Sequence, residues 1–202
     1  MSRRFIYIYD TYCGYCRGAH PTISALIESG AEVEMLHVHL FRDSKAHRMA
    51  DGFAKHALAH DTRIAALTGQ DFDQNYVEHV LQSPTEILDS TFTAWAAALV
   101  HDRGAKIEIK LAHDLQNLRY LDGISAQNRS AVEAALARLG VTSPLEGGVK
   151  TAAQTAMRAK EILNSLNLST VPQLIVEDSG ERTVLSIADF YKSPTAVTAL
   201  AS

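Results

Sequence analysis

The sequence predicts a one-domain α/β fold, in which a strand–helix–strand unit and a closing hairpin are separated by a long helical block. Strand-like apolar runs at 5–9 and 32–41 flank a helical pattern near the N-terminus. Residues 43–166 show helical periodicity and no convincing strand, and strand-like runs return at 173–177 and 182–187. We therefore expect βαβ followed by ββα, with a helical insertion between the two.

The strand–helix–strand unit has recognisable boundaries. Aromatic and β-branched residues alternate over 5–9, which indicates a buried strand, and a helical pattern begins at Cys13. We expect Pro21 to kink this helix and Gly30 to cap its end. The strand at 32–41 follows, and a right-handed crossover would make the two strands parallel.

The helical block is divided by glycine and proline residues. Helical periodicity recurs at 45–60, 73–82, 85–102, 111–121, 126–139 and 150–166. We expect Pro84 at a helix start, and we expect 106–110, which alternates, to be a loop or helix lead-in. Near the C-terminus, the turn 178–180 joins the two hairpin strands, and a helical tail follows from about Ala188.

Composition and charge exclude several classes of protein. The 202 residues are 47% hydrophobic and 21% charged, which argues against intrinsic disorder. The 19 basic and 23 acidic residues give a net charge of −4 without a basic stripe, so we expect no nucleic-acid partner. No apolar run approaches the length of roughly 18 residues that a membrane-spanning helix needs, so we expect no membrane association.

The N-terminus and the few cysteines favour a cytoplasmic protein. The apolar run at 5–9 is shorter than that of a signal peptide, which needs about 7–15 residues. The chain has 2 cysteines, and such sparse usage suits a reducing compartment. We therefore expect a cytoplasmic location.

The two cysteines form a Cys-x-x-Cys motif, Cys13 and Cys16, directly after the first strand. Alone, this motif could also be half of a zinc site. Zinc needs four ligands, and the sequence has no second pair of this kind. Two histidine pairs, at 37/39 and 56/60, could ligate a metal, but we expect them to be hydrogen-bonded or partly exposed histidines. We expect neither a metal nor another cofactor.

The position of the motif favours redox chemistry. A cysteine that opens a helix meets unpaired backbone N–H groups and the positive end of the helix dipole, and both favour its thiolate form. Cys13 therefore suits attack on a disulfide. Cys16, one turn further on and more interior, suits resolution of the mixed disulfide. The alternative is a pair of unreactive buried cysteines.

Together, the motif and a second signature resemble a known family. Residues 9–16, Thr170-Val171-Pro172 before the hairpin, and the helical insertion resemble the DsbA-like branch of thioredoxin-fold oxidoreductases, with the motif nearest to FrnE-like cytoplasmic members. The resemblance implies a thioredoxin-like domain at 1–42 and 167–202, with 43–166 as an all-helical insertion. It also implies a cis peptide bond before Pro172, and it implies that Val171 holds the substrate backbone.

Two departures from that family concern the redox site. Enzymes of this fold commonly place a buried carboxylate six residues before the first cysteine, where this chain has Tyr7. Asp10 could substitute, although we favour a turn role for it. The dipeptide at 14–15 contains no histidine, which strongly oxidising members use to stabilise the thiolate, and we expect Arg17 to be a solvated helix residue. Strong oxidising power is therefore not implied.

Four tyrosines surround the motif. We expect Tyr7 and Tyr9 to be core residues of the first strand. Tyr12 and Tyr15 flank the cysteines, so we expect them to be exposed and to bind substrate.

The favoured function is that of a protein-disulfide oxidoreductase or isomerase that uses Cys13 and Cys16. Its substrates would be protein or small-molecule disulfides and thiols, with glutathione as a candidate partner. One alternative is a glutathione-dependent enzyme of the 2-hydroxychromene-2-carboxylate isomerase or kappa-class transferase type, although the second cysteine argues against it. Another is a non-catalytic redox sensor.

Overall fold

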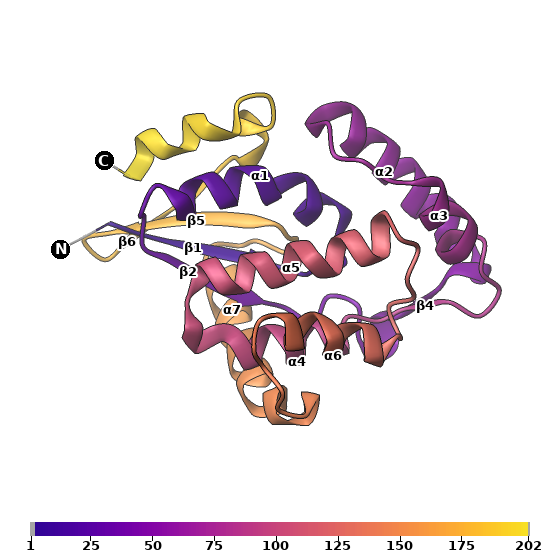
Figure 1. Ribbon diagram of the computed structural model, residues 1–202. Helices are drawn as coiled ribbons and strands as arrows, with labels where there is room; N and C mark the ends of the chain where they lie inside the picture. The colour runs from indigo at the N-terminus through magenta and orange to yellow at the C-terminus, as the bar shows by residue number, and fades with distance from the viewer. Residues whose placement is uncertain (1–2, 202) are drawn as a thin grey trace.

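A four-stranded sheet lies at the centre of the computed structural model, which describes residues 3–201 (Figure 1). β1 (Arg4–Tyr9) pairs in parallel with β2 (Val33–His37) and antiparallel with β5 (Gln173–Asp178). β5 in turn pairs antiparallel with β6 (Glu181–Leu185), in the hairpin that the sequence predicts. The strand order is β2–β1–β5–β6, so the two ends of the chain build one sheet.

The α-helices account for most of the remaining chain. They are α1 (Gly14–Glu28), α2 (Phe53–Thr68), α3 (Gln74–Tyr76), α4 (Thr91–Val100), α5 (Ala105–Tyr120), α6 (Arg129–Arg138) and α7 (Val149–Ser165). α3 continues into a π-helical turn, Val77–Leu81. Short 3-10 helices lie at Asp43–Lys45, Met49–Asp51, His101–Arg103, Leu145–Gly148, Ile187–Phe190 and Pro194–Ala201. Within residues 3–201, no helix combines the length and hydropathy needed to cross a membrane.

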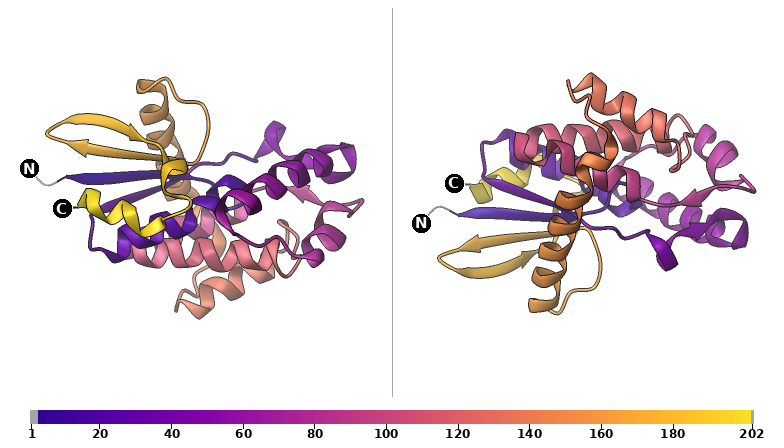
Figure 2. Two further views of the ribbon diagram at one scale, coloured as in Figure 1. Left: turned by 90° about the horizontal axis from the view of Figure 1, so that it is seen from above. Right: turned by 90° about the horizontal axis from the view of Figure 1, so that it is seen from below.

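Helices cover both faces of the sheet (Figure 2). Phe5, Tyr7 and Tyr9 of β1 pack in one core cluster with residues of α1, of α5 and of the C-terminal segment. The alternate residues Ile6 and Ile8 point to the other face, where they pack with residues of α7. Because β1 is buried on both faces, its sequence is a continuous apolar run.

α2 packs closely against α1 at two glycines, Gly14 and Gly18. A Cβ atom on Gly14 would lie 2.5 Å from Asp61 Oδ1, and one on Gly18 would lie 3.0 Å from Ile64 Cγ2. Glycine inside a helix costs backbone entropy, and here it permits the close approach of the two helices. Figure 1 shows α2 and α3 at the end of the molecule away from both termini.

The structure corrects several predicted boundaries near the insertion. A small antiparallel sheet of β3 (His47–Arg48) and β4 (Ile87–Leu88) replaces the starts of two expected helices, at 45–60 and 85–102. Pro84 accordingly lies in a loop and begins no helix. A strand of two residues is too short to show a sequence period, so the sequence gives no sign of β3 or β4.

Three further boundaries differ. Residues 106–110 belong to α5 and are neither loop nor lead-in. β2 ends at His37 instead of continuing to Phe41. Ser29 is the C-cap residue of α1, and Gly30 follows it with a φ of 87°.

The domain division at 1–42, 43–166 and 167–202 stays a prediction, and residues 1–2 and 202 lie outside the described residues. α7 falls within the expected insertion, yet its Ala159 and Ile162 pack directly on the sheet.

Candidate active site

The Cys-x-x-Cys motif lies at the carboxyl end of β1, where the chain turns into α1. Cys13 is the N-cap residue of α1, with extended backbone angles, and its carbonyl accepts hydrogen bonds from the backbone N–H groups of Cys16 (2.9 Å) and Arg17 (3.1 Å). The buried Asp10 shapes the preceding turn, since its carboxylate accepts the backbone N–H groups of Tyr12 and Leu40, each at 2.9 Å. The favoured turn role of Asp10 therefore agrees with its contacts.

The two cysteines differ in their surroundings. Both are free thiols and lie 3.7 Å apart. Cys13 is 7% exposed and Cys16 is 1% exposed, in the order that the sequence predicts. Burial, followed by the hydrogen bond with Cys13, raises the pKa of Cys16 well above its usual value. Cys16 is therefore held as a neutral thiol near pH 7.

The segment before β5 contacts the motif directly. The Val171–Pro172 peptide bond is cis, as the resemblance implies. The Cys13 thiol donates to the Val171 carbonyl at 3.8 Å. This contact brings together two sequence segments that are 158 residues apart.

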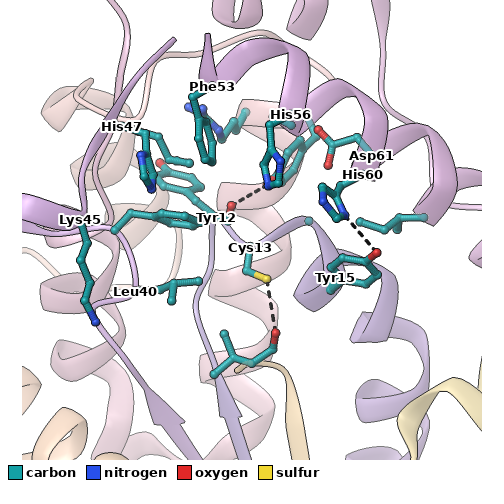
Figure 3. Close-up of a pocket in the computed structure, with 18 of the residues that line it drawn as sticks. Tyr12, Cys13, Tyr15, Leu40, Lys45, His47, Phe53, His56, His60 and Asp61 are labelled. Atoms are coloured by element: carbon teal, nitrogen blue, oxygen red, sulfur yellow. Dashed lines mark hydrogen bonds between the residues drawn. The ribbon is translucent and has the colours of Figure 1, made fainter. Parts of the chain in front are cut away.

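A cavity of about 460 Å³ opens beside Cys13, and residues of α1, α2, α5 and the segment before β5 line it (Figure 3). Its lining includes several aromatic side chains, among them Tyr12, Phe41, Phe53 and Tyr120. Figure 3 shows His56 and His60 of α2 facing the same space as Cys13. The cavity can therefore receive an apolar or aromatic group next to the Cys13 thiol.

A second cavity, of about 570 Å³, lies on the other side of the segment before β5. Pro172, Leu185 and Tyr191 are among its lining residues, while Tyr15 and Val171 line both cavities.

The two tyrosines expected at the surface have different environments. Tyr12 is only 5% exposed, which contradicts the expected exposure, although its side chain does line the first cavity. Its backbone carbonyl accepts a hydrogen bond from Tyr120 Oη at 2.7 Å, which holds it against α5. Tyr15 is half-buried, and its hydroxyl forms a hydrogen bond with His60 Nδ1 at 3.2 Å.

Arg17 is buried, contrary to the expectation that it is solvated. It is 3% exposed and donates to the Asp71 carbonyl and to Asn117 Oδ1, each at 3.0 Å. Its guanidinium also lies over the rings of Phe72 (5.6 Å) and Tyr120 (5.4 Å). Arg17 thus ties α1 to the insertion.

Other titratable side chains near the motif are buried. Tyr7 and Tyr9 are core residues, each 1% exposed, as expected. Burial, with a further contribution from the neighbouring Cys16, raises the pKa of Tyr7 well above 10, so it cannot replace a carboxylate near pH 7. Burial also raises the pKa of Asp10, to about 6.

The histidine pairs form no metal site. His37 is buried, and its ring nitrogen accepts the Thr11 backbone N–H at 3.1 Å. The rings of His56 and His60 lie 4.4 Å apart. In the described part of the chain, no three His, Cys, Asp or Glu side chains are arranged to hold a metal ion.

Sequence patterns single out only part of the α2 surface that contacts the motif. Asp61 lies against Gly14, and burial raises its pKa to about 6, while Tyr76 donates to its carboxylate at 2.9 Å. For His60, the i, i+4 spacing with His56 indicates a candidate pair of metal ligands and gives no sign of contact with the motif.

Comparison with known proteins places the fold among solved structures. No family model and no curated protein matches the chain. The cytosolic disulfide reductase DsbM from Pseudomonas aeruginosa superposes with a TM-score of 0.86 at 22% identity, over 98% of this chain and 96% of that one. The same reductase determined with GSH gives a TM-score of 0.83 at 21% identity, with the same coverage.

Two further structures are similar over most of their length. A candidate protein disulfide isomerase from Nitrosomonas europaea gives a TM-score of 0.72 at 16% identity, over 99% of this chain and 98% of that one. A candidate DsbA oxidoreductase from Streptomyces coelicolor gives 0.62 at 17% identity, over 98% and 89%. The chain therefore has the DsbA-type thioredoxin fold, a βαβ and ββα scaffold with a large helical insertion.

Proposed function

We propose that this protein is a thiol–disulfide oxidoreductase that uses Cys13 and Cys16. The observation that carries the proposal is the asymmetry of the pair at a helix start. Cys13 caps α1 beside a cavity and against the Val171 carbonyl, while Cys16 is buried one turn further on with its pKa raised. This asymmetry suits one attacking and one resolving thiol.

The proposed reaction proceeds in two exchanges. The Cys13 thiolate attacks one sulfur of a substrate disulfide, forms a mixed disulfide and releases the other half as a thiolate, which takes a proton from solvent. Cys16 then loses its proton and attacks Cys13, which releases the second thiol and leaves a Cys13–Cys16 disulfide. The substrate gains two electrons and two protons, which the two cysteines lose. Run in reverse, the same steps form a disulfide in the substrate.

The substrate and the reductant form a finer part of the proposal. We propose that the two cavities beside Val171 take the two sides of a protein or small-molecule disulfide, with Tyr12, Tyr15, Val171 and Pro172 as substrate-binding residues. Two glutathione thiols would reduce the Cys13–Cys16 disulfide and form oxidised glutathione. The similarity to a cytosolic reductase determined with GSH supports this reductant and a cytoplasmic location.

The test is reduction of a peptide disulfide, followed with and without glutathione, together with trapping of the intermediate. We expect wild-type turnover that needs a thiol reductant, no turnover for Cys13→Ser, and a stable mixed disulfide for Cys16→Ala. Mild alkylation of the reduced protein should label Cys13 before Cys16, because Cys16 is the more buried thiol.

Each alternative predicts a different result. Glutathione-dependent activity that persists in Cys16→Ala would favour the isomerase or transferase function. A protein that oxidises reversibly but turns over no disulfide would favour a redox sensor. Preferential labelling of Cys16 would reverse the assigned roles of the two cysteines.

A further inference from the structure

We propose that His60, on α2 of the insertion, is a positioning residue that sets the reactivity of Cys13 by placing positive charge beside its thiolate. His60 lies outside the Cys-x-x-Cys motif and 45 residues from Tyr15, the motif residue with which it forms a hydrogen bond. The proposal rests on the proposed function only for its effect on turnover. Its effect on Cys13 can be measured independently.

Both residues between the cysteines contact adjacent residues of α2. The Tyr15 hydroxyl forms a hydrogen bond with His60 Nδ1 at 3.2 Å, and the two rings meet edge to face with centroids 5.7 Å apart. At Gly14, any side chain would strike Asp61, since a Cβ there would lie 2.5 Å from Asp61 Oδ1. The motif therefore packs closely against α2. Two contacts, Gly14 with Asp61 and Tyr15 with His60, hold this part of α2 beside the motif.

The shared cavity connects His60 to Cys13. Both side chains line the 460 Å³ cavity, and Figure 3 shows them facing the same space, with Tyr15 beside them. The low polarity of the lining weakens dielectric screening, so a charge in this cavity acts over a longer distance than it would in water. A histidine is charged over part of the range around pH 5–8, and a neighbouring cation favours a thiolate over a thiol.

Other groups in the cavity modify this charge. The charged or titratable cations that line it with His60 are Lys45, His47, His56 and Arg119. Arg119 is neutralised by Glu86, whose carboxylate oxygen lies 2.7 Å from its guanidinium, and Lys45 is exposed at the surface. Only His60 of these cations bonds to the motif in the described residues.

The opposing charge comes from Asp61. Its carboxylate, whose pKa burial raises to about 6, would disfavour the thiolate once it ionises. Tyr76 donates to that carboxylate, and the tyrosines at 12, 76 and 120 stay neutral because burial raises the pKa of each. The field at Cys13 therefore depends on Asp61 and on the three histidines of the cavity, His47, His56 and His60, and Tyr15 holds His60 against the motif.

The test measures the rate of Cys13 alkylation against pH in the reduced full-length protein, with labelled peptides identified by mass. His60→Gln removes the charge but keeps a partner for the Tyr15 hydroxyl. We expect it to slow alkylation roughly three- to tenfold near pH 6 and to move the midpoint of the rate profile to higher pH. The rates should converge at high pH, where Cys13 is a thiolate in both proteins.

A charge-preserving variant and a control separate charge from structure. His60→Lys should restore alkylation near pH 6, because it returns a cation to the same position. His79→Gln, an exposed histidine that does not line the cavity, should leave the profile unchanged. Tyr15→Phe, which removes the hydroxyl that holds His60, should slow alkylation by less than His60→Gln does.

Superimposed profiles for wild type and His60→Gln would overturn the proposal, as would equal slowing by His60→Gln and His60→Lys, which would indicate a structural role. Disulfide turnover, measured on the same proteins, separates this result from the proposed function. A shifted profile in a protein without turnover would retain the role of His60 and reject the oxidoreductase. Normal turnover with an unshifted profile would retain the oxidoreductase function and reject the role of His60.

Discussion

At the scale of single residues, Arg119, which lines the first cavity, belongs to a buried ion pair. Arg119 Nη1 donates to Glu86 Oε1 at 2.7 Å, and the two side chains are 1% and 2% exposed. The same carboxylate oxygen accepts the Ala126 backbone N–H at 3.0 Å, while the guanidinium lies over the ring of Tyr12 at 5.1 Å. The pair thus supports a wall of the candidate active site.

Removal of the charge on Glu86 should destabilise the protein strongly. Glu86→Gln leaves the Arg119 guanidinium buried without a counter-charge, and we expect the free energy of unfolding to fall by about 3–5 kcal/mol. Urea denaturation near pH 7 measures this change. The control is Asp114→Asn, which breaks the i, i+4 pair with Lys110, whose side chains are 20% and 57% exposed, and should cost about 1 kcal/mol or less. Similar losses for both variants would contradict the buried-pair argument.

His101 should make stability depend on pH. Its Nδ1 lies 2.9 Å from Glu108 Oε2, and this hydrogen bond raises the pKa of His101 above 6.5. A raised histidine pKa means that the folded state holds the proton more tightly. Its contribution is therefore complete below pH 6.5 and is lost as the pH rises through the folded-state pKa.

Between about pH 6 and about pH 8, we expect the free energy of unfolding of His101→Gln to fall by less than that of the wild type. Denaturant melts of wild type and variant at several pH values test this expectation. Parallel pH profiles for the two proteins would show that the pair does not contribute.

Sequence patterns predict apolar residues better than buried polar ones. The apolar run at 5–9 predicts that Tyr7 and Tyr9 are core residues. No such pattern predicts the burial of Arg17, because its partners Asp71 and Asn117 come from distant parts of the chain. A charged residue next to a motif has no local signature that distinguishes a solvated side chain from one that bridges two segments.

At the scale of secondary-structure elements, α7 and α4 pack closely at Gly148. This glycine precedes Val149, the first residue of α7, and a Cβ on it would overlap the backbone carbonyl of Trp95 in α4. The neighbouring Gly147 has room, since a Cβ there would lie 3.4 Å from Leu99 Cδ2. The two adjacent glycines therefore form a matched pair for mutation.

We expect Gly148→Ala to lower the free energy of unfolding by roughly 1–3 kcal/mol, because the helix backbone must move to admit the methyl group. Gly147→Ala should change it by less than about 1 kcal/mol, because the added atom makes an ordinary contact. Thermal and denaturant unfolding of the two variants provide the comparison. Equal effects would show that Gly148 is not needed for the close contact of α4 with α7.

Sequence patterns predict an element well when it is long enough to show several repeats of its hydrophobic period. The hairpin of β5 and β6 and the helix α7 match their expected ranges closely, since each spans several repeats of its pattern. β3 and β4 have two residues each, and their pairing is decided by the fold around them. The extension of α5 over 106–110 was missed because alternating Ile and charged residues suit a strand as well as one turn of a helix.

At the scale of the whole molecule, the first cavity is lined by residues from distant parts of the chain. Cys13 follows β1, whereas Phe53 and Ala57 lie on α2 and Tyr120 is the last residue of α5. Under the proposed function, reaction at the thiol and binding of the substrate would therefore fall to different parts of the chain.

A substitution in the cavity wall should separate binding from reactivity. Ala57 is half-buried on α2 and lines the cavity, so Ala57→Phe would fill part of it without altering the motif. We expect kcat/KM for a bulky peptide disulfide to fall by roughly tenfold. Alkylation of Cys13 by a small reagent should stay the same. A parallel loss of both activities would show that the change disturbs Cys13 itself.

The βαβ unit and the closing hairpin could be predicted because each is signalled within a short stretch of chain, whereas the pairing of β1 with β5 joins the two ends of the chain and has no local signal. The cavity could not, because Tyr12, His60 and Tyr120 meet only after α2 and α5 have packed on α1. The cis bond before Pro172 follows from the family resemblance, and no pattern in the residues places Val171 next to Cys13.

The seating of α2 on the motif has a consequence for evolution and for engineering. Each residue between the two cysteines contacts a residue of α2, Gly14 with Asp61 and Tyr15 with His60, so the dipeptide is not independent of that helix. A spacer transplanted from another enzyme would meet a helix surface shaped for a different pair. Positions 14 and 61, and likewise 15 and 60, should therefore covary among homologues, and a functional exchange should require both members of each pair to move together.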